Sequence, residues 1–331
     1  MATPIWKDYT VTLGNADSYD FIIYDAATSA GNAIYQGTAY KRPGEASVKV
    51  KVNDICASYL AQKLTLDLST ITTFLNESAP LSSYFSLYVG TTKKADWQMY
   101  LNWEYKDGST DKIAALAHAP ITGRLQYGMV FVLTQLEPLA SGQTIVYSHG
   151  VPGSASATNY TTTVAGPLNF YKKASENTAD AVVSLRRYGT LSNINYSLIP
   201  KCHRWALYYV NELGGIDVLV MEGKWRMTDG YGRNTYKRSY DNSATQNRGE
   251  VNYLNDITRT WELHTGWLTD AEAGRMGHLL GSPLVFLCDC DDGGKLYPVI
   301  VTNKDCPYKT HKDGMVSYQI DVQLARDMRR Q

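Results

Sequence analysis

The chain has 331 residues with 32 basic and 32 acidic side chains, so its formal net charge at neutral pH is zero. This balance argues against a dedicated nucleic-acid binder or a protein held on an anionic membrane, because both need a broad basic surface. Tyrosine is unusually frequent, with 25 residues against 6 phenylalanines. Its apolar ring and polar tip favour half-wet surfaces such as subunit interfaces and sugar-binding platforms, or simply a strand-rich fold.

The start of the chain lacks the basic segment and apolar stretch of a signal peptide, and no run reaches the roughly 18 apolar residues of a membrane span. We therefore expect no membrane partner, and a product that stays where it is made or leaves by lysis. The five cysteines are odd in number and scattered along the chain. This pattern predicts reduced, cytoplasmic thiols and no disulfide framework.

Short runs of aromatic and β-branched residues, separated by glycine and proline turns, open the chain. Their spacing predicts the strands of a small β-sandwich or half of a barrel. Asn53 is expected to cap a short helix, since Ile55, Tyr59 and Leu60 recur at helical spacing. The predicted strands around this helix cover residues 4–14, 18–25, 33–41, 45–52, 83–90 and 97–109.

The middle of the chain also has the pattern of strands. Residues 123–138 form the most apolar candidate for a strand pair, and strands are predicted at 182–189 and 193–200. Residues 150–166, rich in small side chains, form either an exposed loop or a flat hairpin. We place the main boundary near residue 200. The predicted division is an N-terminal β-sandwich region, 1–200, as one module or as two at about 1–65 and 66–200, and a C-terminal domain, 201–331.

The C-terminal region has the clearest local signals. Alternating apolar residues on both sides of Gly214-Gly215 predict a hairpin over residues 205–221. Thr269 and Glu272 have the spacing of a capping box, which predicts one helix over 269–280 ahead of further strands. The predicted fold is therefore mainly β, with two or three antiparallel β-sandwich or barrel domains. The C-terminal domain is expected to carry a single flanking α-helix.

The residue patterns contain no recognisable catalytic motif. Cys288 and Cys290, with Cys306 and His311 downstream, are the only grouping that suggests a metal, but zinc sites favour cysteines two residues apart. Buried cysteines beside a turn are the favoured interpretation. We expect no enzyme activity, cofactor or metal, although a carboxylate pair for glycoside hydrolysis stays open because space and not sequence spacing defines it.

A polar segment of residues 226–250 is predicted as a long insertion that is basic in its middle and spaced with tyrosines. Arginine among aromatic side chains suits nucleic-acid stacking, an arm on a neighbouring subunit, or a solvated hairpin tip. The neutral charge of the chain favours the arm. The candidate subunit interface comprises Trp225, Arg226, Tyr231, Arg233, Tyr236, Lys237, Arg238 and Tyr240.

Three C-terminal stretches resemble a family of virion tail proteins. They are WALYYVNELGGIDVLVMEGK at 205–224, TWELHTGWLTDAEAGRMGHLLGSPLVFL at 260–287 and KLYPVIVTN at 295–303. The family is encoded by tailed phages of Bacteroidetes, including crAss-like phages. The N-terminal stretches WKDYTVTLG, AYKRPGE and NDICASYL are similar to it as well, whereas the middle has no matching motif.

The resemblance implies a tail-tube-like fold and a structural subunit of a tail hub or neck ring, without catalytic residues. The implied partners are copies of itself and neighbouring tail, neck or portal-adaptor proteins, with tail fibres as further candidates and DNA only in transit. The implied location is the virion tail, after assembly in the host cytoplasm. The alternative is a carbohydrate-binding adhesin module that uses Trp97 or Trp103 as a stacking platform.

Overall fold

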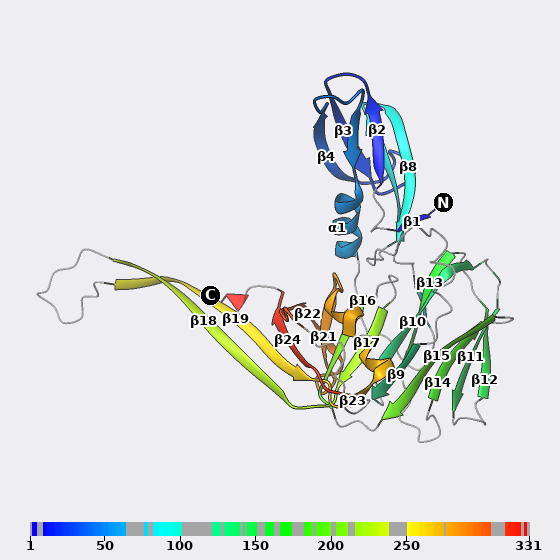
Figure 1. The fold of residues 1–331 in the computed structure, drawn as a ribbon, viewed down its shortest axis with the longest axis vertical. Coiled ribbons are helices and arrows are strands. Elements are labelled where there is room, and N and C mark those ends of the chain that lie inside the picture. Colours follow the sequence, from blue (N-terminus) through cyan, green and yellow to red (C-terminus); the bar gives the residue numbers. More distant parts are fainter. Residues whose placement is uncertain are drawn as a thin grey trace, which may run out of the picture.

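A computed structural model gives the fold of the chain (Figure 1). It is mainly β, with several antiparallel sheets, as predicted. The structure describes residues 2–4, 9–63, 76–78, 82–100, 121–126, 129–139, 142, 144–150, 156–161, 166–173, 182–187, 190–199, 203–210, 216–237, 250–274, 276–305, 315–325 and 328–329.

The N-terminal strands form two sheets around one core. One sheet has the order β1-β8-β7-β3-β4, and the other pairs β2 with β5. Phe21, Ile23, Phe85 and Leu87 point inward from their strands and are buried in this core. The bounds are β1 (Ala2–Pro4), β2 (Thr10–Gly14), β3 (Ser18–Tyr24), β4 (Ala33–Tyr40), β5 (Val48–Lys51), β7 (Ser82–Val89) and β8 (Thr92–Tyr100).

Helix α1 (Asn53–Lys63) closes one end of these sheets, and its Cys56 and Leu60 belong to their core. Asn53 is the first helical residue, and the Val52 carbonyl accepts the bond from the Cys56 N–H at 3.1 Å. The Asn53 Oδ1 accepts a hydrogen bond from the backbone N–H of Tyr9 at 2.6 Å. The helix therefore starts where it was predicted, but the bond to the Val52 carbonyl makes Val52 the N-cap and Asn53 the first helical residue. The Asn53 side chain fixes the chain just before β2.

The middle strands form two further sheets, of order β10-β13-β6 and β12-β11-β14-β15-β9. The two strands predicted in 123–138 exist, but their pairing as a hairpin is wrong: β9 pairs in parallel with β15, and β10 pairs with β13. The segment left open as loop or hairpin contributes β12, which pairs with β11. The bounds are β6 (Asn76–Ser78), β9 (Ile121–Gln126), β10 (Val130–Leu139), β11 (Thr144–Gly150), β12 (Ser156–Thr161), β13 (Gly166–Lys173), β14 (Val182–Arg187) and β15 (Thr190–Ile199).

The largest sheet lies in the C-terminal region, with the order β17-β16-β21-β22-β24-β19-β18 and β25 pairing with β19. The first strand of this sheet begins at residue 205, beyond the predicted boundary near 200, while the division into domains stays a prediction. The bounds are β16 (Trp205–Val210), β17 (Ile216–Met221), β18 (Trp225–Lys237), β19 (Glu250–His264), β20 (Leu268–Thr269), β21 (Val285–Asp289), β22 (Lys295–Val301), β23 (Met315–Val316), β24 (Gln319–Leu324) and β25 (Met328–Arg329).

The hairpin predicted over residues 205–221 is confirmed, since β16 and β17 pair antiparallel. Both strands are buried on both faces. One face contributes Leu207 and Leu219 to the C-terminal core, and on the other face the Tyr208 hydroxyl donates a hydrogen bond to the Val130 carbonyl. Strand β17 also lies against β9 and β10, so middle strands cover the second face of the sheet at this end.

The capping box is confirmed, but the single helix over 269–280 is wrong. The Thr269 N–H and hydroxyl both donate to Glu272 Oε2, at 2.9 and 3.0 Å. The helix is split into α3 (Asp270–Ala273) and α4 (Met276–Leu280), with a turn at Gly274. Gly274 and Gly277 explain the interruption, because each glycine costs a helix about 1 kcal/mol relative to alanine.

Candidate functional site

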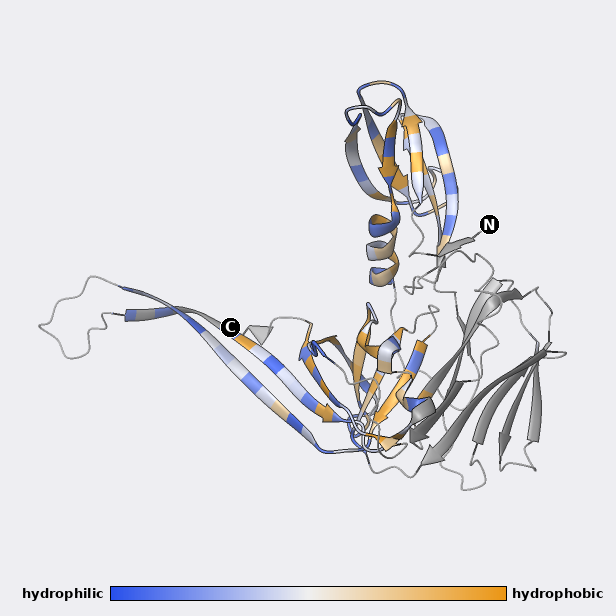
Figure 2. Cartoon of the chain, viewed as in Figure 1, coloured by the Kyte–Doolittle hydropathy of each residue, from blue (hydrophilic) through white to orange (hydrophobic). Residues whose placement is uncertain are grey.

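The described parts of β18 and β19 form a two-stranded arm that leaves the body of the molecule (Figure 1). The strands pair antiparallel from Trp225 opposite Leu263 to Lys237 opposite Glu250. Residues 225–237 are strand throughout, so the first half of the predicted polar insertion has regular structure. Figure 2 shows that the arm is mostly hydrophilic or neutral, whereas apolar residues gather in the body sheets. Asp229 between Met227 and Tyr231 interrupts the apolar alternation that marks a strand in the sequence.

The arm has two distinct faces, because side chains alternate along a strand and paired residues share a face. At the root, Trp261 and Leu263 point into the C-terminal core. We name the face of the arm that they share the inner face and the opposite one the outer face. The inner face carries Trp225, Met227, Asp229, Tyr231, Arg233 and Lys237 of β18. The outer face carries Arg226, Thr228, Gly230, Gly232, Asn234 and Tyr236.

Apolar side chains continue from the core along the inner face of the arm, where they are exposed. The side chains of Trp225, Met227 and Tyr231 are 45, 47 and 60% exposed. Tyr231 lies opposite Ile257, which is half-buried, so the stripe involves both strands. Apolar side chains in a row on a projecting ribbon mark a contact surface more often than isolated exposed residues do.

A bidentate ion pair crosses the inner face between the apolar positions. Arg259 Nε lies 2.7 Å from Asp229 Oδ1, and Arg259 Nη2 lies 2.8 Å from Asp229 Oδ2. The hydrogen bonds to Asp229 raise the pKa of Arg259, so the guanidinium stays charged. On the outer face, Arg226 and Glu262 approach only to 4.0 Å and are exposed. The inner pair therefore holds the register of the two strands more firmly than the outer pair does.

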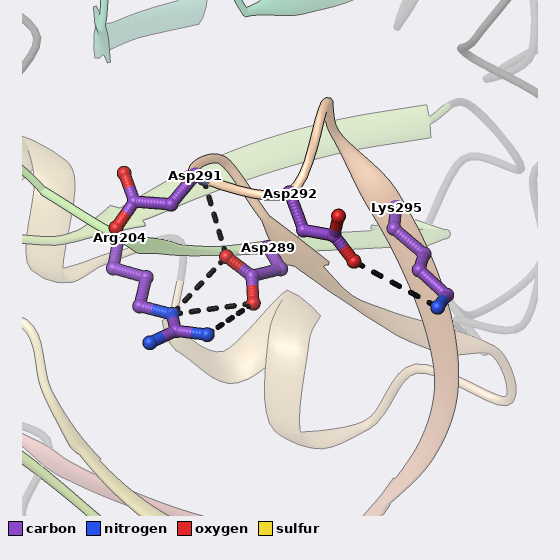
Figure 3. Close-up of polar contacts among 5 residues, drawn as sticks. All are labelled: Arg204, Asp289, Asp291, Asp292 and Lys295. Atoms are coloured by element: carbon purple, nitrogen blue, oxygen red, sulfur yellow. Dashed lines mark hydrogen bonds and ion pairs between the residues drawn. The ribbon is translucent and has the colours of Figure 1, made fainter.

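The root of the arm is fixed to the body by a cation between two aromatic rings. The Arg204 guanidinium lies 4.9 Å from the ring of Trp205 and 5.5 Å from that of Trp225. The two rings meet edge to face at 5.7 Å, and Trp205 meets Trp261 similarly at 6.1 Å. The guanidinium is also held by the buried Asp289 at the end of β21, with Nη2 to Oδ2 at 2.7 Å (Figure 3). The first residue of the arm thus packs on a rigid cluster.

A close crossing of backbones lies beside this cluster. The Gly223 N–H donates to the His264 carbonyl at 2.9 Å, and the His264 N–H donates to the Lys224 carbonyl at 3.0 Å. A Cβ atom on Gly223 would lie 2.6 Å from the His264 Cβ and 2.9 Å from its carbonyl oxygen. Glycine is therefore required where the chain turns from β17 into the arm.

The acidic residues beside Cys288 and Cys290 form ion pairs and hydrogen bonds. Asp289 accepts the bonds from Arg204 and one from the Asp291 N–H at 3.2 Å, while Asp292 lies 3.7 Å from Lys295 (Figure 3). A hydrogen bond with Cys290, together with burial, raises the pKa of Cys288, which stays a thiol. Among the residues that the structure describes, no group of three histidine, cysteine or acidic side chains could hold a metal, and Cys306 and His311 lie outside them.

The structure places six of the eight predicted interface residues on β18, where they divide between the faces. Trp225, Tyr231, Arg233 and Lys237 share the inner face, and Arg226 and Tyr236 share the outer one. Arg238 and Tyr240 lie outside the described residues. The sequence did not predict a role for Met227, or for the paired residues Arg204, Asp229, Arg259 and Asp289. The two pairs join residues 85 and 30 positions apart, and such separations leave no local signal.

Trp97, expected as an exposed sugar platform in the adhesin alternative, is a core residue. It is 5% exposed and packs between Tyr9 and Phe85, at ring distances of 5.1 and 6.0 Å. Trp103 lies outside the described residues. The tryptophan that the alternative relied on within the described part of the chain is therefore not available to a sugar ring.

Comparison with protein-family models and with curated protein sequences finds no match to this chain. In the parts of the chain that the structure describes, none of the helices has the length and apolar character needed to cross a membrane. The geometry of the arm and its root therefore carries the functional argument, together with the sequence resemblance given above.

Proposed function

We propose that the chain is a structural subunit of a ring in the tail hub or neck of a tailed phage, and that the arm is its contact with the next copy. The observation that supports this most is the exposed apolar stripe of Trp225, Met227 and Tyr231 on a projecting ribbon with an anchored root. A two-stranded ribbon is at best marginally stable alone in water. A partner that covers one face would supply the missing contacts.

The C-terminal region gives the proposal its architecture. One large antiparallel sheet with α3 and α4 packed into its core supports the proposal of a tail-tube-like fold. In that fold, identical copies close a ring through head-to-tail contacts, in which one surface meets a different surface of the neighbour. The work of such a subunit is mechanical, without catalysis or cofactor.

The charge balance agrees with a conduit for DNA in transit. With 32 basic and 32 acidic side chains, the chain has no excess of cations to hold phosphates. Each retained phosphate contact would slow the passage of DNA through a lumen. The further partners that we propose are neighbouring tail, neck or portal-adaptor proteins, with the ring as an attachment platform in the virion tail.

Single-particle imaging of the purified full chain tests the proposal. We expect closed rings of one symmetry, and an antibody against the chain should label the tails of particles in a phage lysate. A chain that stays monomeric at the highest soluble concentration, or an antibody label found away from tails, would overturn the proposed function. Turnover of a capsule or peptidoglycan substrate by the purified chain would overturn it as well.

A further inference from the structure

An exposed apolar spot lies on the other side of the same sheet from the core. Ile300 of β22 is 57% exposed, and Pro298 on the same face is also exposed. Between them, Val299 points inward and is buried in the core. Ile300 lies opposite Gln323, which in turn lies opposite Thr260 of β19. We name this surface, formed by Pro298, Ile300, Gln323, Asp321 and Glu262, the outer patch.

The outer patch has two acidic side chains beside its apolar spot. Asp321 of β24 and Glu262 of β19 lie directly opposite each other in register. Like charges in such positions destabilise a sheet. Arg226 approaches Glu262 only to 4.0 Å, and the Asp321 Oδ1 accepts a hydrogen bond from Gln319 at 2.8 Å. A basic side chain of a partner would therefore be stabilised beside Ile300, because it would offset the repulsion between Asp321 and Glu262.

The inner face of the arm has apolar and basic side chains in an order that complements the apolar and acidic side chains of the outer patch. Met227 and Tyr231 supply apolar surface, and Arg233 follows two residues beyond Tyr231 on the same face. Two residues along a strand span roughly 7 Å. On the outer patch, Asp321 lies two residues along β24 from Gln323, the partner of Ile300, so the step from apolar to acidic is also roughly 7 to 8 Å.

The arm cannot cover the outer patch of its own molecule. Both belong to one sheet, and the inner face of the arm points to the opposite side of that sheet from Ile300. Each copy therefore offers two different complementary surfaces at once, which is the requirement for a head-to-tail contact that repeats around a ring. The outer patch of a second copy offers the inner face of the arm both an apolar surface and acidic side chains.

We infer that the inner face of the arm, through Met227, Tyr231 and Arg233, docks on the outer patch around Ile300 and Asp321 of a second copy. This inference rests on the proposed ring and specifies the two surfaces that meet in it. The apolar side chains bury one another, and Arg233 pairs with the acidic side chains beside Ile300.

Disulfide trapping in the full chain tests which surfaces meet. The variant Tyr231→Cys/Ile300→Cys should form a reducible ladder of multimers under mild oxidation. The matched control Thr228→Cys/Ile300→Cys places its thiol on the outer face of the arm and should give no more multimers than the single variants. The wild type and the three single variants measure the background from the native cysteines.

The outcomes separate the inference from the proposed function. Rings in the wild type without a ladder from the Tyr231 and Ile300 pair would overturn the inference and leave the ring standing. Equal ladders from the Tyr231 and Thr228 variants would also overturn it, because docking would then not select the inner face. A wild type that forms no rings would overturn both.

A charge exchange gives a second readout that needs no cysteine. Arg233→Glu should shift the protein from rings to monomers, and adding Asp321→Arg should restore the rings, with melting temperatures showing that each variant is folded. Loss of rings without restoration in a folded double variant would contradict the assigned pairing. Rings that persist in Arg233→Glu alone would contradict it as well.

Discussion

The Arg204 guanidinium binds the buried carboxylate of Asp289 through two nitrogens, with Nε 3.1 Å from Oδ1 and Nη2 2.7 Å from Oδ2. The same guanidinium lies over the ring of Trp225, the first residue of the arm. The ion pair thereby joins the end of β21 to the start of β18. The direction in which the arm leaves the body depends on this joint.

Replacing Arg204 by lysine should destabilise the C-terminal region by about 2 kcal/mol, because lysine loses the two-nitrogen geometry and the flat contact with Trp225. Urea unfolding followed by tryptophan fluorescence measures the change. Lys295→Ala is the matched control, since Lys295 and Asp292 are both exposed and 3.7 Å apart, and its effect should stay below about 0.5 kcal/mol. Equal losses of unfolding free energy in the two variants would show that the contacts of Arg204 with Asp289 and Trp225 do not stabilise the C-terminal region.

Gly223→Ala should destabilise the protein by more than about 2 kcal/mol, because the added Cβ would lie 2.6 Å from the His264 Cβ and neither backbone can move without breaking the crossing. Gly230→Ala is its control on the arm, where the nearest atom to a new Cβ is the Thr258 carbonyl oxygen at 3.7 Å. Thermal unfolding should show little change for this control. A tolerated Gly223→Ala would mean that the crossing is looser than its geometry indicates.

Asp25 should make the N-terminal sheets sensitive to acid. Burial alone would raise its pKa, but hydrogen bonds from Tyr59 and Asn32, together with Lys63, lower it from 3.8 to about 2. The stabilisation is therefore present above about pH 4 and is lost as the pH falls through about 2. Asp25→Asn should cost of the order of 1 kcal/mol at neutral pH.

Thermal unfolding of wild type and Asp25→Asn across this range measures the effect, and the two curves should converge towards pH 2. Tyr59→Phe removes one donor to Asp25 and should reduce the acid sensitivity only in part. A difference between wild type and Asp25→Asn that stays constant with pH would rule out the assigned titration.

Met227→Ser/Tyr231→Ser should abolish assembly while leaving the fold intact. Both side chains are about half exposed, so their replacement should change the free energy of unfolding by less than about 1 kcal/mol. Thr228→Ala/Asn234→Ala alters the outer face of the arm without changing a residue of β19 beside the outer patch, and it should keep the rings. Light scattering after size exclusion checks the assembly, and loss of rings in the outer-face variant alone would reverse the assignment of the faces.

The parts of the fold predicted correctly depend on neighbours in sequence. The hairpin of β16 and β17 was predictable because its apolar runs flank Gly214-Gly215, and the capping box because Thr269 and Glu272 are three residues apart. The break at Gly274 was missed because the apolar spacing from Ala273 to Met276 continues across it. Local sequence patterns thus predicted these secondary-structure elements, but they did not predict the break within the helix.

The parts that could not be predicted depend on tertiary pairing. The partners of β9 and β10 lie in strands at least 27 residues away, so their apolar runs could not show that they belong to different sheets. The arm was found as a polar segment with candidate residues, but its strand structure follows only from the register with β19. Its two faces, and with them the role of Met227, become visible once that register is known.

Shortening the arm tests most directly whether the arm builds the assembly. Gly230 and Thr258 lie directly opposite, so replacing residues 231–257 by an Asn-Gly turn retains the root and the ion pair between Asp229 and Arg259. Mass photometry should show rings for the full chain and folded monomers for the shortened one. Rings of unchanged size and stability in the shortened chain would contradict the account.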